Sequence, residues 1–265
     1  MRHAVPFVLL VLAPGPATAW GPVAHQAVVS RTLDTLPGGL KAYYKNHRLE
    51  IPTLSLEAPA PAEEGLDRRF AVDRLLPFPF ADLPRSEAAM TARFGDAAPV
   101  GRLPWLIQES YARLVEAFKG GEKERILPES DTLAGLVADL HDPLALSDNA
   151  DGQKTGQHGL WIRFSSKLPE AMEKRLKLQP EAAVLLDDPR EYVFSMASAT
   201  YVWLDNLLYL EDLTRRSSSG YSQLYYESFE LRAGDLLRTR LSTAAADAGS
   251  YWYTAWTAAG RPTLK

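Results

Sequence analysis

Apolar side chains recur every three or four positions over most of this sequence, which is the spacing of one face of an α-helix. The clearest run lies between Pro104 and Phe118. Its apolar positions are Ile107, Tyr111, Leu114, Val115 and Phe118. Pro104 suits a first helical turn and Gly120-Gly121 ends the pattern, so the sequence predicts a helix here.

A second helix signal begins at Asp188, where a capping Asp, an early Pro and a Glu three residues after the cap precede a periodic run through Leu208. Further helices are predicted over residues 25–36, 86–94, 130–146 and 224–248, with a shorter one near Pro169. Strand signals are scarce, and no repeat or linker divides the chain. We therefore predict an all-α fold, with a single helical domain over residues 20–265.

Two stretches interrupt this regularity. Residues 49–82 contain five prolines, which predicts a long surface loop with at most one helical turn. Residues 147–159 are polar and rich in Asp and Gly, and they follow a helix expected to end near Pro143. Long loops of this kind are often functional.

The first nineteen residues have the pattern of a secretory signal peptide. Arg2 and His3 precede an apolar run from residue 4 to 13, and Ala17-Thr18-Ala19 forms a small-x-small cleavage site. The run is shorter than the roughly 20 residues a spanning helix needs, and prolines interrupt it. We predict cleavage after Ala19, a mature chain beginning at Trp20 in the periplasm or outside the cell, and no transmembrane segment.

The composition restricts the chemistry. With 46% hydrophobic and 23% charged residues, the chain is typical of a globular domain. It has no cysteine, so thiolate metal sites, disulfides and a cysteine nucleophile are excluded. A net charge of −4 provides no general attraction to nucleic acid.

Cleavage after Ala19 would create a candidate metal ligand. The free α-amine of Trp20 and the Trp20 carbonyl oxygen could together chelate a metal, and His25 could complete the group. Nitrogen and oxygen donors in a compact arrangement suit zinc. A Trp near a mature terminus followed by a His is, however, more often explained by packing.

A second candidate region begins at the end of the predicted central helix. Asp139, His141 and Asp142 are followed by Asp148, Asp151 and His158, and this density of carboxylates and imidazoles can bind a divalent ion. The same residues can equally form a helix end and a solvated loop. A calcium-loop pattern fails because Ser147 stands at its first position and His158 at its closing position.

Several motifs together resemble the zinc-dependent phospholipase C and single-strand-specific nuclease superfamily, across nearly the whole mature chain. They are Trp-Gly-x-x-x-His at residues 20–25, Asp-x-x-x-Pro-Leu at 139–144 and Asp-Gly-Gln-Lys-Thr-Gly-Gln-His-Gly at 151–159. Pro79-Phe80, Leu83-Pro84-Arg85, the stretch 101–105, Ala255-Trp256 and Gly260-Arg261-Pro262 resemble the family's spacers and C-terminus.

The resemblance implies an all-helical domain that holds three zinc ions and cleaves phosphodiester bonds, with a zinc-bound hydroxide attacking phosphorus. One of the three implied sites is complete in residue type. It uses the N-terminal amine and carbonyl, the His of the first motif and the Asp of the central helix, which fall on Trp20, His25 and Asp139.

The other two implied sites have lost ligands. The family places a His one turn before the central Asp, a His after Pro-Leu, and a His followed one turn later by Glu or Asp after the glycine-rich stretch. The residues at these four positions are Gly135, Ala145, Trp161 and Ser165. Because closely spaced divalent ions need several anionic ligands, we do not expect a three-zinc cluster.

The loop ligands depend on the register of the alignment. The family's His-Phe pair falls on Arg69-Phe70 and its Pro-Asp on Pro52-Thr53, although a shifted register would make Asp73 a ligand. Arg69 would bring positive charge to the place of a cation. A loop shift would similarly allow His158 to replace the ligand lost at Trp161.

Three interpretations remain open, and the first is favoured. In the first, the chain is a non-catalytic homologue with one residual zinc or none, and it binds or scaffolds outside the cytoplasm. In the second, it is a one-metal phosphoric ester hydrolase at Trp20, His25 and Asp139, assisted by His141 or His158 as acid or base. In the third, the metal has a structural role. If activity is retained, the net charge favours a phospholipid or small phosphoester over nucleic acid.

Overall fold

The computed structural model describes residues 19–51, 67–95 and 100–264, and this part of the chain contains helices but no strand. The all-α prediction is confirmed. The predicted signal peptide lies outside the described residues except for Ala19, and so does Pro52-Thr53. Among the described residues, no helix is both long and apolar enough to cross a membrane.

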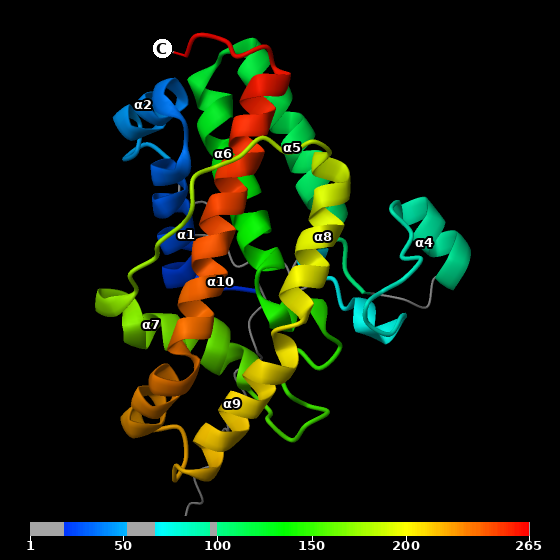
Figure 1. Cartoon of the computed structure of the whole chain (residues 1–265), viewed down its shortest axis with the longest axis vertical. Coiled ribbons are helices and arrows are strands. Elements are labelled where there is room, and N and C mark those ends of the chain that lie inside the picture. Colours follow the sequence, from blue (N-terminus) through cyan, green and yellow to red (C-terminus); the bar gives the residue numbers. More distant parts are fainter. Residues whose placement is uncertain (1–18, 52–66, 96–99, 265) are drawn as a thin grey trace, which may run out of the picture.

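A single long helix organises the fold. Helix α10 (Gln223–Ala258) runs through most of the length of the molecule (Figure 1). It packs against α1 (Pro22–Thr35), α5 (Leu103–Gly120), α6 (Lys123–Leu140) and α9 (Leu204–Arg216). α5 and α6 also pack against each other.

Small buried residues explain how α10 takes neighbours on more than one face. Ala244, Ala245, Ala248 and Gly249 are buried in its second half. A Cβ on Gly249 would lie 2.0 Å from the hydroxyl oxygen of Thr35 in α1. The glycine therefore allows the close approach of α1 and α10.

Two of the predicted helices have a side-chain cap at their first turn. Ser86 accepts a hydrogen bond from the backbone of Ala89 at the start of α4 (Glu87–Phe94). Asp188 accepts from two backbone N–H groups at the start of α8 (Pro189–Tyr201), as its sequence motif indicates.

Other boundaries differ from the prediction. α6 begins at Lys123 and ends at Leu140, and the segment Pro143–Leu146 forms a separate 3-10 turn, because Pro143 lacks the N–H that a continuing helix needs. The run after Asp188 is divided between α8 and α9 near Trp203. α2 (Gly38–Asn46) was not predicted.

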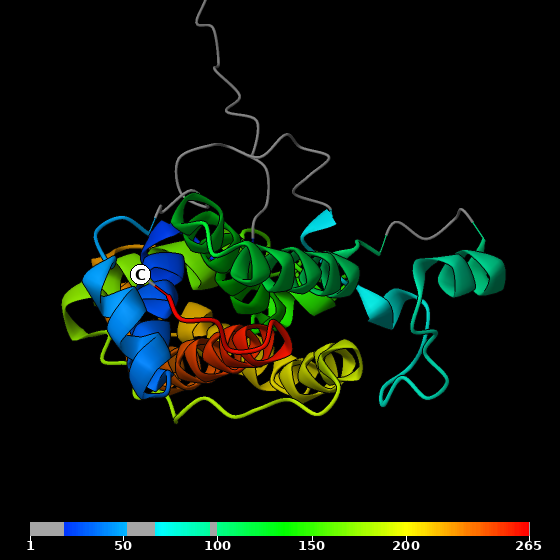
Figure 2. The same ribbon diagram turned by 90° about the horizontal axis from the view of Figure 1, so that it is seen from above.

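The remaining elements lie around this bundle. A π-helical turn, Ile162–Lys167, leads into α7 (Leu168–Met172), and an extended segment of residues 176–188 then crosses α10. In the described part of the predicted long loop, Val72–Arg74 forms a 3-10 turn. α4 stands away from the bundle in both views (Figure 1 and Figure 2).

Candidate functional site

The start of the predicted mature chain is held against the π-helical turn. Gly21 precedes α1, and its N–H donates to the Ser165 carbonyl oxygen at 2.8 Å. A Cβ on Gly21 would lie 2.7 Å from Oγ of Ser166 and 3.0 Å from its Cα. Glycine is therefore required by the close approach of the two backbones, and this approach directs α1 so that His25 points inward.

Trp20 is fully buried and links this chain start to the end of α6. Its indole Nε1 donates to the Ala138 carbonyl oxygen at 2.7 Å, and its ring packs against Phe164 with centroids 5.5 Å apart. Its backbone nitrogen lies 3.4 Å from Oδ1 of Asp139. The packing of one tryptophan thus brings the chain start to the predicted carboxylate ligand.

The three residues predicted from the sequence come together. Asp139 lies in the last turn of α6 with a fully buried side chain, and its Oδ1 is 2.7 Å from Nε2 of His25. The nitrogen of Trp20 contacts the same oxygen. The grouping of Trp20, His25 and Asp139 expected from the sequence is therefore present in the fold.

A fourth residue, Arg68, completes the group and was not predicted. Its Nε donates to Oδ2 of Asp139 at 2.6 Å, and its Nη2 lies 2.5 Å from the same oxygen. Burial opposes ionisation of the carboxyl, but the Arg68 guanidinium and His25 imidazole beside it hold the pKa of Asp139 below its usual range. Asp139 is therefore a buried carboxylate whose Oδ2 is paired with a side-chain cation.

Arg68 decides how well this group suits a metal ion. The donor types are those of a zinc site, since an imidazole, a carboxylate and a backbone nitrogen converge. Yet one carboxylate oxygen faces His25 and the other is held by the guanidinium. A divalent ion here would stand beside a fixed positive charge, so the residues present do not fit a metal while Arg68 remains in place.

The neighbouring Arg69 behaves differently from the prediction. It was expected to bring positive charge to the metal's position, but its Nη2 donates to the Ser147 carbonyl oxygen at 2.8 Å. The charge at Asp139 comes from Arg68, one residue earlier. The sequence shows two adjacent arginines, and the path of the backbone alone determines which of them faces the carboxylate.

Residues at the positions where the resemblance implies missing ligands make contacts within the protein. Trp161 donates from Nε1 to the Ala19 carbonyl oxygen at 2.9 Å, and the hydroxyl of Ser165 donates to Oδ2 of Asp142 at 2.6 Å. The Ala145 carbonyl oxygen accepts from the backbone of Phe70. In the described ranges, no three His, Cys, Asp or Glu side chains form a metal-ligating group. The predicted site needs only two such side chains, so this finding does not test it.

His141 is buried rather than on the surface. Its Nε2 lies 2.9 Å from Oδ2 of Asp247, and its Nδ1 accepts from Nη2 of Arg240 at 2.6 Å. Burial lowers the pKa of His141, and the Arg240 charge acts in the same direction against the opposing effect of Asp247. Because arginine only donates, Nδ1 carries no proton and the imidazole is neutral. His141 is therefore committed to contacts with α10.

Asp142 is also buried. Its Oδ1 accepts from the backbone of Leu144 at 2.9 Å, and its Oδ2 accepts from Ser165. Burial raises the pKa of Asp142 to about 7. This carboxyl joins α6, the following 3-10 turn and the π-helical turn.

The polar loop after α6 does not converge on Asp139. The His158 side chain is exposed, and its carbonyl oxygen accepts from Arg163 at 2.6 Å. Asp148 pairs with Lys154 at 2.7 Å. Asp73, the alternative loop ligand, accepts from the hydroxyl of Ser147 and the backbone of Asp148 instead. These contacts stabilise the loop.

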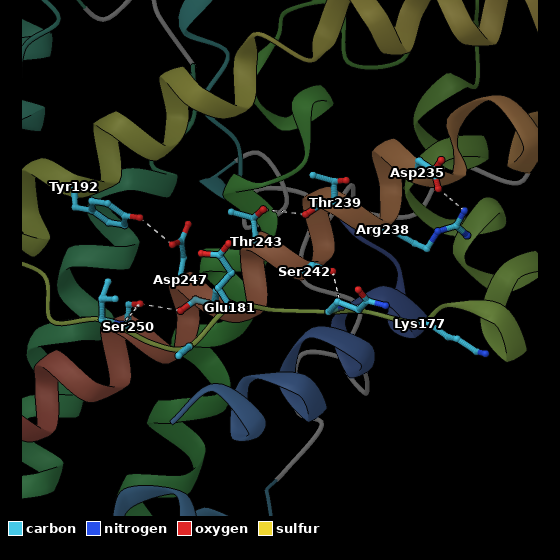
Figure 3. A pocket seen from close by; sticks show the side chains of 14 residues that line it. Lys177, Glu181, Tyr192, Asp235, Arg238, Thr239, Ser242, Thr243, Asp247 and Ser250 are labelled. Carbon is cyan, nitrogen blue, oxygen red and sulfur yellow. Dashed lines mark hydrogen bonds and ion pairs between the residues drawn. The ribbon is translucent and has the colours of Figure 1, made fainter. Parts of the chain in front are cut away.

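A polar groove of about 730 Å³ runs along α10 beneath the extended segment (Figure 3). The Ser242 and Ser250 hydroxyls accept from the backbone of Gln179 and Val184 and fix the segment above the helix. At one end, Asp247 accepts from the Tyr192 hydroxyl at 2.8 Å. The polar groups that line the groove thus pair largely with one another.

Comparison with known proteins adds no relative: no protein-family model and no curated protein matches this chain.

Proposed function

We propose that this chain is an exported, non-catalytic protein of the zinc-dependent phospholipase C and nuclease type, in which the Arg68 guanidinium stands in place of a metal ion. The observation that carries this proposal is the contact of Arg68 with Oδ2 of buried Asp139. A guanidinium supplies charge compensation, but it carries no bound water to activate and has no open coordination position.

The contacts at the lost-ligand positions support the same conclusion. Trp161 and Ser165 hydrogen-bond to the chain start and to Asp142, so they support packing around the site. The two histidines proposed as acid or base also lack suitable positions, because His141 is committed to Arg240 and Asp247, and His158 is exposed. The remaining role is binding or scaffolding outside the cytoplasm.

A second candidate is a one-zinc protein, either a phosphodiesterase acting on a phospholipid or small phosphoester, or one with a structural metal. One observation favours it: the backbone nitrogen of Trp20 and Nε2 of His25 lie 3.4 Å and 2.7 Å from the same oxygen of Asp139. This arrangement would require Arg68 to move away from the carboxylate.

Zinc content and hydrolysis separate these candidates. Protein beginning at Trp20 is purified with zinc present, dialysed and measured for bound zinc, and a generic phosphodiester is offered as substrate. We expect no stoichiometric zinc and no turnover. About one zinc per chain would overturn the Arg68 proposal, and turnover that is lost in both His25→Ala and Asp139→Asn would establish the enzyme.

Two matched variants sharpen this test. Arg68→Met removes the guanidinium and leaves His25 and Asp139 in place, so we expect it to bind zinc more tightly than the unchanged protein does. Arg69→Met removes the neighbouring arginine, which contacts the Ser147 carbonyl oxygen rather than Asp139, and should leave zinc binding unchanged. Equal zinc affinity in all three proteins would contradict the idea that Arg68 takes the cation's place.

A further inference from the structure

The peptide bond between Ala19 and Trp20 lies inside the folded protein. The exposed fractions of these residues are 2% and 0%. The Ala19 carbonyl oxygen accepts from Nε1 of Trp161, and the Trp20 nitrogen lies 3.4 Å from Oδ1 of Asp139. The atom that would become the mature N-terminus therefore faces a buried carboxylate.

Cleavage changes the charge at this position. Water adds across the Ala19–Trp20 bond, the carboxyl group leaves with Ala19, and the amide nitrogen of Trp20 becomes a primary amine that is protonated near neutral pH. We infer that the mature Trp20 ammonium forms a buried ion pair with Asp139, so that cleavage at this one bond stabilises the fold without a metal. This inference rests on the export and cleavage in the proposed function.

The contacts of Asp139 leave a place for this ammonium. Arg68 occupies Oδ2, whereas His25 and the Trp20 nitrogen share Oδ1. Nε2 of His25 makes a single hydrogen bond to Oδ1, and a carboxylate oxygen accepts more than one. Replacing an amide N–H with an ammonium strengthens the existing contact, because charge-assisted hydrogen bonds are shorter and stronger than neutral ones.

The other effect of cleavage is smaller. Removing Ala19 takes away the carbonyl oxygen that accepts from Nε1 of Trp161. Trp161 is only partly buried, so its N–H can turn to water instead. The gained ion pair therefore outweighs the lost hydrogen bond, and a chain that starts at Trp20 is more stable than one that starts at Ala19. In the longer chain the nitrogen facing Asp139 remains an uncharged amide.

The test compares proteins beginning at Trp20 and at Ala19, released from a fusion by a protease that leaves no extra residue and kept in EDTA. We expect the Trp20 form to melt higher by about 5 °C or more. The difference should disappear when both forms carry Asp139→Asn. A difference that persists with Asp139→Asn would assign the effect to another contact and overturn the ion pair.

A second measurement needs no substitution, in case Asp139→Asn does not fold. Acetylation of the Trp20 amine is followed by mass spectrometry of the N-terminal peptide, in native protein and in urea. We expect at least about tenfold slower modification in the native protein, and equal rates would overturn the inference.

The outcomes also separate this inference from the proposed function. Equal melting of the two forms, with no zinc bound to either, overturns the ammonium pair and leaves the Arg68 proposal intact. A difference that appears only with added zinc and disappears in EDTA overturns both, because the amine is then a metal ligand.

Discussion

We expect the ion pair between Arg68 and Asp139 to contribute measurably to the stability of the fold, and Arg68→Met tests this directly. Arg68→Met keeps the apolar length of the side chain but removes the two nitrogens that contact Oδ2 of Asp139. The carboxylate is fully buried and the arginine is 18% exposed, so the substitution leaves a buried charge with fewer partners.

Its magnitude follows from this burial. Removing one partner of a buried ion pair typically costs 3–5 kcal/mol, and His25 and the Trp20 nitrogen still contact the other oxygen. We therefore expect the lower end of that range, about 3 kcal/mol. For a chain of this size, such a loss lowers Tm by about 6–12 °C.

The assay is urea denaturation at pH 7 of four proteins: the unchanged chain, Arg68→Met, Asp139→Asn and the double variant. The double variant should lose less stability than the sum of the two single variants, because neither group is then left charged without its partner. Arg69→Met, which removes a hydrogen bond to a carbonyl oxygen, should cost only about 1 kcal/mol. A loss below about 1 kcal/mol for Arg68→Met, or full additivity, would refute the reasoning.

Three further predictions concern other buried groups. Burial raises the pKa of Asp142 to about 7, so the contribution of its protonated form to stability is complete below about pH 4 and is lost as pH rises to about 7. In urea denaturation, Asp142→Asn should match the unchanged protein at pH 4 and exceed its stability at pH 8 by up to about 4 kcal/mol. Parallel pH profiles of the two proteins would contradict this prediction. Glu211→Gln should lower stability by about 3 kcal/mol because it leaves Arg163 buried without its 2.7 Å ion pair. Glu230→Gln, in a pair whose arginine is 61% exposed, should cost under about 1 kcal/mol in the same urea denaturation. Gly21→Ala should destabilise by about 1–3 kcal/mol, because its Cβ would lie 2.7 Å from a hydroxyl of the π-helical turn, and an unchanged Tm would show that the turn can move.

Much of the fold follows from local patterns in the sequence. The apolar spacing of residues 104–118 and the capping motif at Asp188 each act within a few residues of the chain, so they predict helices without knowledge of the tertiary structure. Boundaries were less predictable. The division near Trp203 and the extension of α6 back to Lys123 depend on packing against distant helices.

The candidate site shows the same distinction. The family resemblance carried by residue types and their order was sufficient to group Trp20, His25 and Asp139, which lie in contact in the structure. It was not sufficient to choose between Arg68 and Arg69, or to bury His141, since ion-pair partners are selected by where the backbone passes. The sequence thus determined which side chains could meet at this site. Only the tertiary structure decided that the Arg68 guanidinium lies at the Asp139 carboxylate, because the partner of a buried charge depends on positions set by residues far apart in the chain.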